Sequence, residues 1–384
     1  MRKNGIIAVL AAVMLLGSTV VYGAEQAPQA TDNKAVFSQA LDMTEAVGAS
    51  VPGVTFNYTI AAGAAVAESS ANAEVKAGVV VTDAQGNVTA PTIQGEAFSS
   101  ADTVSSSKVV KNITVDFAGV TFTQPGIYRY VVNASPSGNA DITNDAEPNR
   151  YLDAYVTRNA DGSLSVTSYV VKKEIVNPAQ TVNHGEIGYT YGEVAKSEGY
   201  TSTYKTYSLS LEKKVEGSMA DLSRKFDFTL AFTGPAGTSF TCVIRNGGTD
   251  TAEAPVVLDE NGTASVTGIQ LNNSTGTYVI TGVPSTVSYK ITENIDDGEG
   301  YTTTHQINKG AATGTITTGT STSADSTKEL MGKNENRVIF TNTKNAVSPT
   351  GIVRNVLPYV LMVGIAILSI FAVHVGKKKE KPEK

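Results

Sequence analysis

The stretch Leu209-Ser-Leu-Glu-Lys-Lys-Val-Glu-Gly217 alternates apolar and polar residues, a pattern that predicts a β-strand with one face toward a core. Side chains two residues apart lie on the same face of a strand. Lys213 is therefore in phase with Leu211 and Val215, whereas Lys214 is in phase with solvent. A lysine among core positions needs a chemical explanation, because an unpaired buried charge is costly.

Two later segments also carry one polar residue in phase with an apolar face. Tyr289-Lys-Ile-Thr-Glu293 puts Glu293 on the face of its tyrosine and isoleucine, and Ile339-Phe-Thr-Asn342 puts Asn342 on the face of its phenylalanine. If the three polar residues lie apart at strand ends, each simply contacts water. If they meet in the interior, they can compensate one another.

A meeting of these residues has a chemical consequence. A dry interior lowers the pKa of a lysine and raises that of a glutamate, so the amine becomes a neutral nucleophile. We hypothesise that Nζ of Lys213 attacks Cγ of Asn342 while Glu293 polarises the carbonyl and transfers protons. Ammonia leaves, and an intramolecular isopeptide bond forms in a single turnover driven by proximity.

An internal repeat predicts two domains of one type. Phe56-Asn-Tyr-Thr-Ile60 resembles Phe226-Asp-Phe-Thr-Leu230, and the alternating segment 126–132 resembles 286–291 at a similar offset. Ser, Thr, Val, Gly and Ala dominate the chain, which favours short strands and turns. Antiparallel hairpins are expected at Asp161-Gly162, Asn246-Gly247 and Asn261-Gly262. We therefore predict an all-β protein with two tandem Ig-like β-sandwiches, and with a boundary between residues 199 and 206.

The two ends of the chain predict export and anchoring. Arg2 and Lys3 followed by the largely apolar residues 6–21 indicate a signal peptide over residues 1–23, with a membrane anchor as the alternative. Residues 356–375 carry no charged residue apart from His374 and are long enough, as a helix of about 30 Å, to cross a bilayer. The domains then span residues 24–204 and 205–346, and residues 347–384 form the sorting signal, transmembrane helix and basic tail.

Composition excludes several classes of function. The chain has one cysteine, Cys242, which we expect to be a buried thiol, and three histidines, so disulfides, multi-histidine metal sites and a Ser/His/Asp hydrolase are not expected. No metal or cofactor is predicted. The exported part holds 22 basic and 34 acidic residues, a net charge of −12, which argues against a nucleic-acid partner.

The segment Val347-Ser-Pro-Thr-Gly351, followed by an apolar span and a basic end, resembles the cell-wall sorting signal of Gram-positive surface proteins. The resemblance implies that a sortase cuts between Thr350 and Gly351 and transfers the Thr350 carbonyl to an amine of peptidoglycan or of another pilin. The usual pattern of such signals is Leu-Pro-x-Thr-Gly, and shaft pilins often have Val-Pro-Thr-Gly; this chain has Ser348 in the place of that valine. The alternative is a single-span membrane protein with a chance Pro-Thr-Gly.

The segments around Lys213, Glu293 and Asn342 resemble the three isopeptide motifs of sortase-assembled streptococcal shaft pilins. The resemblance implies a structural, wall-anchored surface protein whose partners are sortase, other copies of itself or other pilins, peptidoglycan and, for the precursor, the membrane. It implies no enzyme beyond the self-reaction. An adhesin or minor pilin that uses the domains as a stalk is the alternative.

The first domain departs from the family motifs at all three positions, which correspond to Gln39, Ala134 and Ser202. We therefore expect no isopeptide bond at the family position there, while a bond through another lysine such as Lys111 stays open. The family also implies a lysine near the end of the first domain that accepts the next subunit. Lys196 is the candidate; Lys172, Lys173 and Lys205 are its rivals, and an exposed surface lysine is the alternative for each.

Two stretches read as irregular. Residues 61–78 are rich in Ala, Ser and Gly and predict either a short amphipathic helix or a long surface loop, and residues 310–327 predict a solvated loop.

Overall fold

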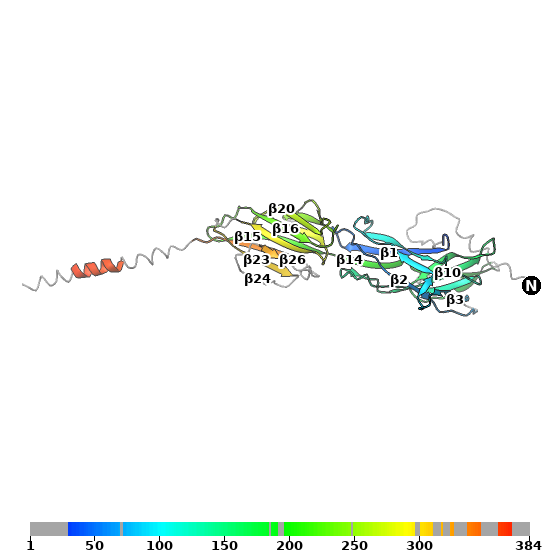
Figure 1. The fold of residues 1–384 in the computed structure, drawn as a ribbon. Coiled ribbons are helices and arrows are strands. Elements are labelled where there is room, and N and C mark those ends of the chain that lie inside the picture. Colours follow the sequence, from blue (N-terminus) through cyan, green and yellow to red (C-terminus); the bar gives the residue numbers. More distant parts are fainter. Residues whose placement is uncertain are drawn as a thin grey trace, which may run out of the picture.

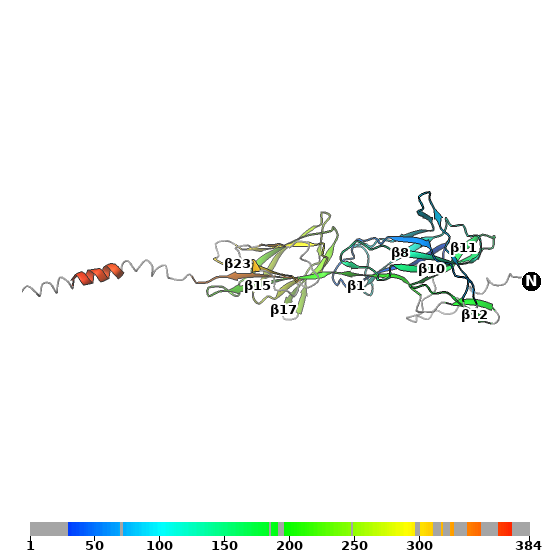
Figure 2. The same ribbon diagram turned by 90° about the horizontal axis from the view of Figure 1, so that it is seen from below.

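The computed structural model describes residues 30–69, 72–183, 186–190, 196–246, 249–295, 300–309, 316–317, 323–325, 336–346 and 360–370. Two β-sandwich domains follow one another along the chain and lie end to end (Figures 1 and 2). The described residues of both domains form strands and connecting turns, so the prediction of an all-β protein is confirmed.

The first domain packs two sheets face to face. One has the strand order β6-β7-β1-β14-β9, and the other has the order β11-β10-β8-β2, with β3 beside β8. Two further pairs, β4-β5 and β12-β13, are hairpins. The strands are β1 (Lys34–Glu45), β2 (Tyr58–Ala62), β3 (Val75–Ala77), β4 (Val81–Thr82), β5 (Val88–Ala90), β6 (Thr92–Gly95), β7 (Lys108–Asp116), β8 (Gly126–Ala134), β9 (Ile142–Thr143), β10 (Asn149–Arg158), β11 (Leu164–Lys172), β12 (Ala179–Asn183), β13 (Glu186–Thr190) and β14 (Gly199–Lys205).

The second domain repeats this arrangement. One sheet has the order β18-β17-β21-β15-β26-β23-β24, with β19 beside β17, and the other has the order β20-β16-β22-β25. The strands are β15 (Tyr207–Glu216), β16 (Phe226–Thr233), β17 (Ser239–Asn246), β18 (Thr249–Ala252), β19 (Val256–Val257), β20 (Thr263–Leu271), β21 (Thr277–Val283), β22 (Ser288–Asn294), β23 (Thr302–Lys309), β24 (Ile316–Thr317), β25 (Ser323–Asp325) and β26 (Asn336–Thr343).

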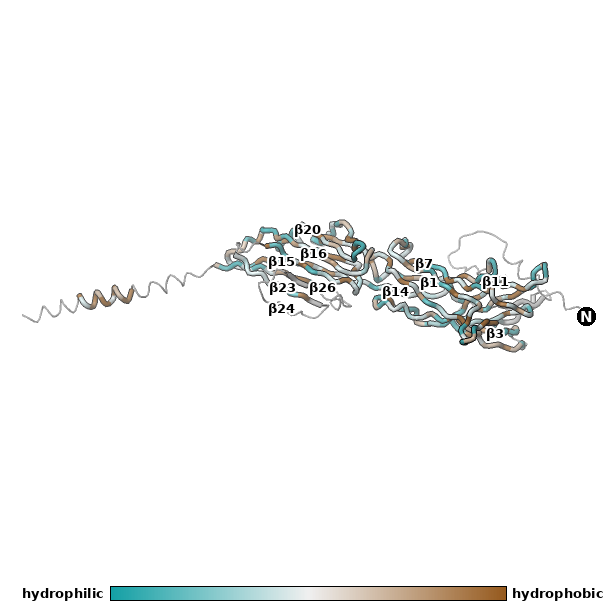
Figure 3. Tube along the Cα trace, in the orientation of Figure 1, coloured by the Kyte–Doolittle hydropathy of each residue, from teal (hydrophilic) through white to brown (hydrophobic). Residues whose placement is uncertain are grey.

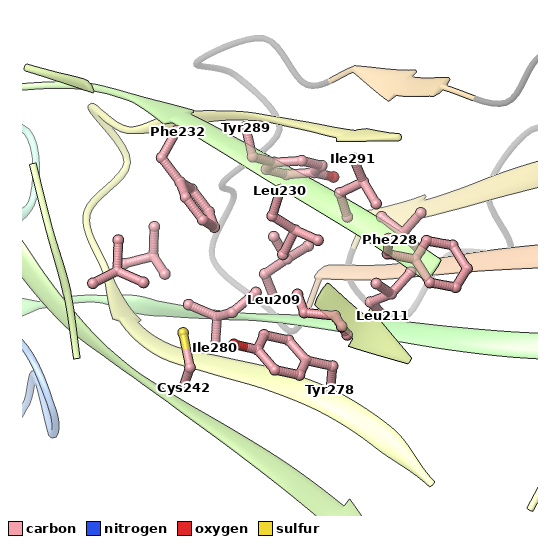
Figure 4. Close-up of a cluster of buried hydrophobic side chains, with 14 of the residues drawn as sticks. Leu209, Leu211, Phe228, Leu230, Phe232, Cys242, Tyr278, Ile280, Tyr289 and Ile291 are labelled. Atoms are coloured by element: carbon pink, nitrogen blue, oxygen red, sulfur yellow. The ribbon is translucent and has the colours of Figure 1, made fainter. Parts of the chain in front are cut away.

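Each domain has its own hydrophobic core between its two sheets. Apolar and polar residues alternate along the strands of both domains, as Figure 3 shows. In the second domain, side chains from β15, β16, β17, β21 and β22 converge in the space between the sheets (Figure 4). Cys242 is fully buried in this core, as expected, and burial raises the pKa of its thiol. Burial of these apolar surfaces is the main favourable term in folding.

The outer face of the β11-β10-β8-β2 sheet is covered by other parts of the first domain. Within residues 61–78, where the sequence left a helix or a loop open, β2 ends at Ala62, Val66 bridges Val75, and β3 joins β8. Glycine is required at Gly63, because an added Cβ would lie 2.5 Å from the side chain of Arg129. Both faces of this sheet are therefore buried over part of its area.

The domains meet at a short joint. Strand β14 ends at Lys205 and β15 begins at Tyr207, so one residue connects the two sandwiches. Hydrogen bonds also cross the joint: the amide of Ser50 donates to the carbonyl of Ser239 at 2.9 Å, and the amide of Ser285 donates to the Asp141 carboxylate at 2.9 Å. The two domains are held together by more than the chain connection.

Three turn predictions have different outcomes. Gly162 has a φ of +87° and lies in the turn between β10 and β11, which pair as an antiparallel hairpin as expected. The turn at Asn261-Gly262 does not join two paired strands. The strand before it, β19, pairs with β17, and the strand after it, β20, pairs with β16. Gly247 lies outside the described residues.

In the stretch 310–327, residues 316–317 and 323–325 form short strands, contrary to the expected loop.

The structure describes only part of the segments that the sequence predicts at the two chain ends. The signal peptide over residues 1–23 and the sorting motif Ser348, Pro349, Thr350 and Gly351 lie outside the described residues. Of the predicted span over residues 356–375, residues 360–370 are described and form a helix. No helix in the described part of the chain has the length and apolarity needed to cross a membrane.

Candidate self-crosslinking site

Lys213, Glu293 and Asn342 meet between the two sheets of the second domain. Lys213 and Asn342 come from the neighbouring parallel strands β15 and β26, where Lys213 is paired with Phe340, two residues before Asn342. Glu293 comes from β22 in the opposite sheet. Parity along each strand explains the convergence, because all three residues share the inward face with fully buried apolar neighbours.

The three side chains are in direct contact and almost wholly buried. Nζ of Lys213 lies 2.8 Å from Oε1 of Glu293. Nδ2 of Asn342 donates a hydrogen bond of 2.7 Å to the same oxygen. Lys213 is 5% exposed, Glu293 1% and Asn342 0%. Glu293 thus joins the amine and the carboxamide through a single oxygen atom.

Aromatic rings form the wall around the amine. Nζ of Lys213 lies 4.4 Å from the ring centroid of Phe226 and 5.9 Å from that of Phe228. Phe228 packs edge to face against Phe340, with ring centroids 5.3 Å apart. These rings exclude water from the site and leave the amine with little polar solvation beyond Glu293.

Burial shifts both ionisable groups toward their neutral forms. It lowers the pKa of Lys213 to about 8, although the neighbouring Glu293 carboxylate opposes this shift. It also raises the pKa of Glu293, although the Lys213 ammonium and the Asn342 hydrogen bond oppose the shift. Transfer of one proton from the lysine to the glutamate would therefore yield a neutral amine beside a protonated acid.

Two oxygen atoms of the site lack hydrogen-bond partners among the described residues: Oε2 of Glu293 and Oδ1 of Asn342. A buried acceptor without a partner costs about 1–3 kcal/mol. A half-turn of the Asn342 carboxamide exchanges its nitrogen and oxygen, after which a protonated Glu293 can donate to Oδ1. That hydrogen bond would draw electrons from Cγ, the atom that the amine of Lys213 must attack.

A second buried lysine, Lys172, lies in the first domain, where the sequence indicated only a rival candidate for the lysine that accepts the next subunit. Nζ of Lys172 lies 2.6 Å from Oδ2 of Asp153, whose two oxygens also accept hydrogen bonds of 2.8 Å from Arg129. Arg129 further donates to Oδ1 of Asn177 at 3.0 Å and to the carbonyl of Val176 at 3.1 Å. These contacts join three strands to the segment that covers them.

The Asp153 cluster differs from the Glu293 site in the charge of its acid. Burial would raise the pKa of Asp153, but the hydrogen bonds and charges of Arg129 and Lys172 outweigh burial and lower it. Asp153 therefore stays ionised, whereas burial lowers the pKa of Lys172 to about 8. An ionised acid cannot donate a proton to a carbonyl, so this cluster is a structural ion network.

The other lysines named from the sequence are distributed as follows. Lys196 is half-buried and bridges Lys172 by backbone pairing. Lys172 is fully buried, which argues against it as the lysine that accepts another subunit. Lys173 is exposed, Lys205 pairs with Glu45 at 2.9 Å, and Lys111 pairs with Asp102 at 2.6 Å.

In the first domain, Gln39 and Ser202 are both buried and in contact, with Nε2 of Gln39 3.3 Å from Oγ of Ser202. Ala134 ends β8 and lines the same pocket as both. No cluster of metal-ligating side chains occurs within the described ranges.

Comparison with known proteins finds relatives over both domains. Residues 56–190 match the family described as the Spy0128-like isopeptide containing domain. Residues 207–344 match a family described as a domain of unknown function, DUF7601. A pilin of Streptococcus pyogenes serotype M1 is 25% identical over 264 residues, which make up 67% of this chain and 69% of that protein.

Solved structures share the fold. The crystal structure of the major pilin from Streptococcus pyogenes superimposes with a TM-score of 0.57 at 20% identity, covering 83% of this chain and all of that one. The major pilin T3.2 of the same species gives a TM-score of 0.55 at 17% identity, with the same coverage. The match to the isopeptide family falls on the first domain, whereas Lys213, Glu293 and Asn342 meet in the second.

Proposed function

We propose that this chain, a structural protein related to the streptococcal major pilins, is the covalently polymerised shaft subunit of a Gram-positive pilus and that an isopeptide bond between Lys213 and Asn342 closes its second domain. The observation that carries the proposal is the shared contact of both side chains with Oε1 of the buried Glu293, at 2.8 Å and 2.7 Å. Burial and the pKa shifts of the pair favour the neutral, reactive forms.

The reaction needs no external reagent. The neutral amine of Lys213 attacks Cγ of Asn342, and the protonated Glu293 donates a hydrogen bond to the carbonyl oxygen as negative charge develops there. In the tetrahedral intermediate, Glu293 gives its proton to the leaving nitrogen and takes one from the attacking nitrogen, so the acid ends protonated as it began. The Nζ–Cγ bond forms, the Cγ–Nδ2 bond breaks, and ammonia departs. The buried amine of Lys213 thereby becomes part of a neutral amide.

The bond would stabilise the second domain. It encloses roughly 130 residues, and a cross-link of that size stabilises by about 5 kcal/mol on the chain-entropy account. Asn342 also lies eight residues before Thr350, the residue at which the next covalent junction would form. Tension that enters at Thr350 would pass through the bond into β15 without loading the rest of the sandwich.

Export and anchoring complete the proposal. A signal peptide over residues 1–23 would direct the chain out of the cell, and the span over 356–375 would hold the precursor in the membrane. Sortase would then cut between Thr350 and Gly351 and join Thr350 to a neighbouring pilin or to peptidoglycan. An adhesin or minor pilin with the same two domains as a stalk is the alternative function.

The test of the bond is the intact mass of the exported chain, residues 24–346. The expected deficit from the sequence mass is one ammonia, and a peptide that joins the segments around Lys213 and Asn342 should appear after proteolysis. Glu293→Ala should restore the full mass, because no proton donor remains.

Glu96→Ala is the matched control, since Glu96 is an exposed glutamate of the first domain. A full-length mass in the wild type would reject the site, and a deficit that survives Glu293→Ala would reject the role of this acid.

Polymerisation is tested separately in cells. Wall extracts should contain a ladder of very large species that resists SDS, and Lys196→Ala should abolish it, whereas Lys173→Ala should leave it unchanged. Single anchored chains in place of a ladder in the wild type would favour the adhesin. A ladder that persists in Lys196→Ala would move the acceptor to another lysine.

A further inference from the structure

The first domain keeps the strand register of the second-domain site. Gln39 on β1 is paired with Tyr200 on the parallel strand β14, and Ser202 lies two residues beyond. On β15 and β26, Asn342 likewise lies two residues beyond the partner of Lys213. Gln39 and Ser202 therefore stand in the same geometric relation as the proposed amine and carboxamide, on homologous neighbouring strands.

The position of the acid is preserved in the same way. In the second domain, Phe228 on β16 is paired with Glu293 on β22. In the first domain, Tyr58 on β2 is paired with Ala134 on β8. Ala134 thus occupies the place of the acid, and Tyr58 occupies the place of an aromatic residue beside the amine.

Hydrogen bonds replace the reactive groups of this site. Gln39 and Ser202 are each 2% exposed. Nε2 of Gln39 donates to the carbonyl of Ala40 at 3.0 Å and lies 3.3 Å from Oγ of Ser202. The hydroxyl of Tyr58, which phenylalanine lacks at the matching position, donates to Oε1 of Gln39 at 2.9 Å. The amide of Gln39 is thereby satisfied on both sides.

The structure also leaves room for a larger side chain at the acid position. A pocket of about 420 Å³ adjoins Ala134, and Gln39, Tyr200 and Ser202 line it as well. A carboxylate-bearing side chain at residue 134 can therefore extend into this pocket, which residues 39 and 202 also line.

We infer that residues 39, 134 and 202 form a dormant cross-linking site: the fold supplies the register, the burial of residues 39 and 202 and the space beside residue 134, and only the three reactive side chains are missing. The inference rests on the proposed chemistry of the second domain. The Tyr58–Gln39–Ser202 hydrogen bonds are the non-covalent substitute for a bond that would link β1 to β14, the first and last strands of the domain.

The substitutions Gln39→Lys, Ala134→Glu and Ser202→Asn together would restore the chemistry. The introduced amine would attack the introduced carboxamide carbon, the introduced carboxyl would carry the proton to the leaving nitrogen, and one ammonia would depart. Tyr58→Phe is a useful fourth change, because it removes a hydroxyl that faces residue 39.

The experiment measures the intact mass of the triple variant of residues 24–346, with and without Asn342→Ala to silence the second domain. The expected deficit is two ammonias without that change and one with it, and a joined peptide should link the segments around residues 39 and 202. The matched control, Gln39→Lys with Ser202→Asn but with Ala134 kept, should show no deficit from the first domain.

Each outcome is decisive. A triple variant that folds and keeps the full mass of its first domain overturns the inference, and so does one whose first domain no longer unfolds cooperatively, because the proposal requires the fold to accept these side chains. A wild-type chain without any deficit rejects the proposed function instead. A deficit in the first domain of the Asn342→Ala background would support the inference even then.

Discussion

At the scale of the residue, the chain contains two buried lysines whose neighbouring acids are shifted in opposite directions. Burial lowers the pKa of Lys213 and of Lys172 to about 8, and each contacts a buried acid. The acid beside Lys172 is held ionised by Arg129, whereas burial raises the pKa of Glu293. The Arg129 guanidinium thus helps to keep the first-domain cluster an ion network, whereas Glu293 is shifted toward its neutral form.

The Asp153 network should be a major source of stability for the first domain. Arg129→Met would leave Asp153 and Lys172 without the guanidinium that binds both carboxylate oxygens, and breaking such a buried network costs about 3–5 kcal/mol. The denaturant midpoint of the first domain should fall accordingly, while that of the second domain stays unchanged. Arg158→Met, at an exposed arginine, is the control and should have little effect.

At the scale of the element, strand parity predicted correctly which side chains of the second-domain strands are buried. Alternation alone put Lys213, Glu293 and Asn342 on inward faces, and each is buried beside the expected apolar neighbours. Their contact could not follow from parity, because it depends on how the strands pair. The parallel pairing of β15 with β26 and the position of β22 in the facing sheet are properties of the whole domain.

The rule that alternate residues face core and solvent fails where a sheet is covered on both sides. Asp153 alternates with Leu152 and Ala154, which lie in the core, so its face would be expected to meet solvent. In the structure that face is buried, because the segments after β2 and after β11 lie over it. The sequence did hold a sign that this face is buried. Ile127 and Val131 lie on the same outer face of β8 as Arg129, and a strand with one face in solvent would carry polar residues there.

Glycine at the end of β15 should control the alignment of the reactive strands. Gly217 has a φ of +107°, and an added Cβ would lie 2.3 Å from the backbone oxygen of Lys344, just after β26. Gly217→Ala should therefore shift β15 against β26 and slow the loss of ammonia, measured by mass during refolding. Gly268→Ala is the control, because Gly268 also has a positive φ but no atom within 4 Å of an added Cβ. Equal rates in both variants would contradict this prediction.

At the scale of the whole molecule, the two domains should respond differently to force. In the second domain, the proposed bond would carry tension from β26 directly to β15. In the first domain, β1 and β14 are held by backbone pairing and by the hydrogen bonds of Gln39, all of which are non-covalent.

Pulling a single chain by its two ends should therefore extend the first domain before any rupture in the second. A force trace should contain one unfolding event whose length matches the first domain, and the Glu293→Ala variant should add a second event. The absence of extension from the first domain, or a second event in the wild type, would contradict this expectation.

The joint at Thr206 has a consequence for any filament built from such chains. One residue separates β14 from β15, and hydrogen bonds from Ser50 to Ser239 and from Ser285 to Asp141 hold the two domains together across it. Each copy would then behave as one stiff segment instead of two hinged beads. Curvature would be confined to the junctions between copies, so the spacing of bends along a fibre would equal the length of a whole subunit.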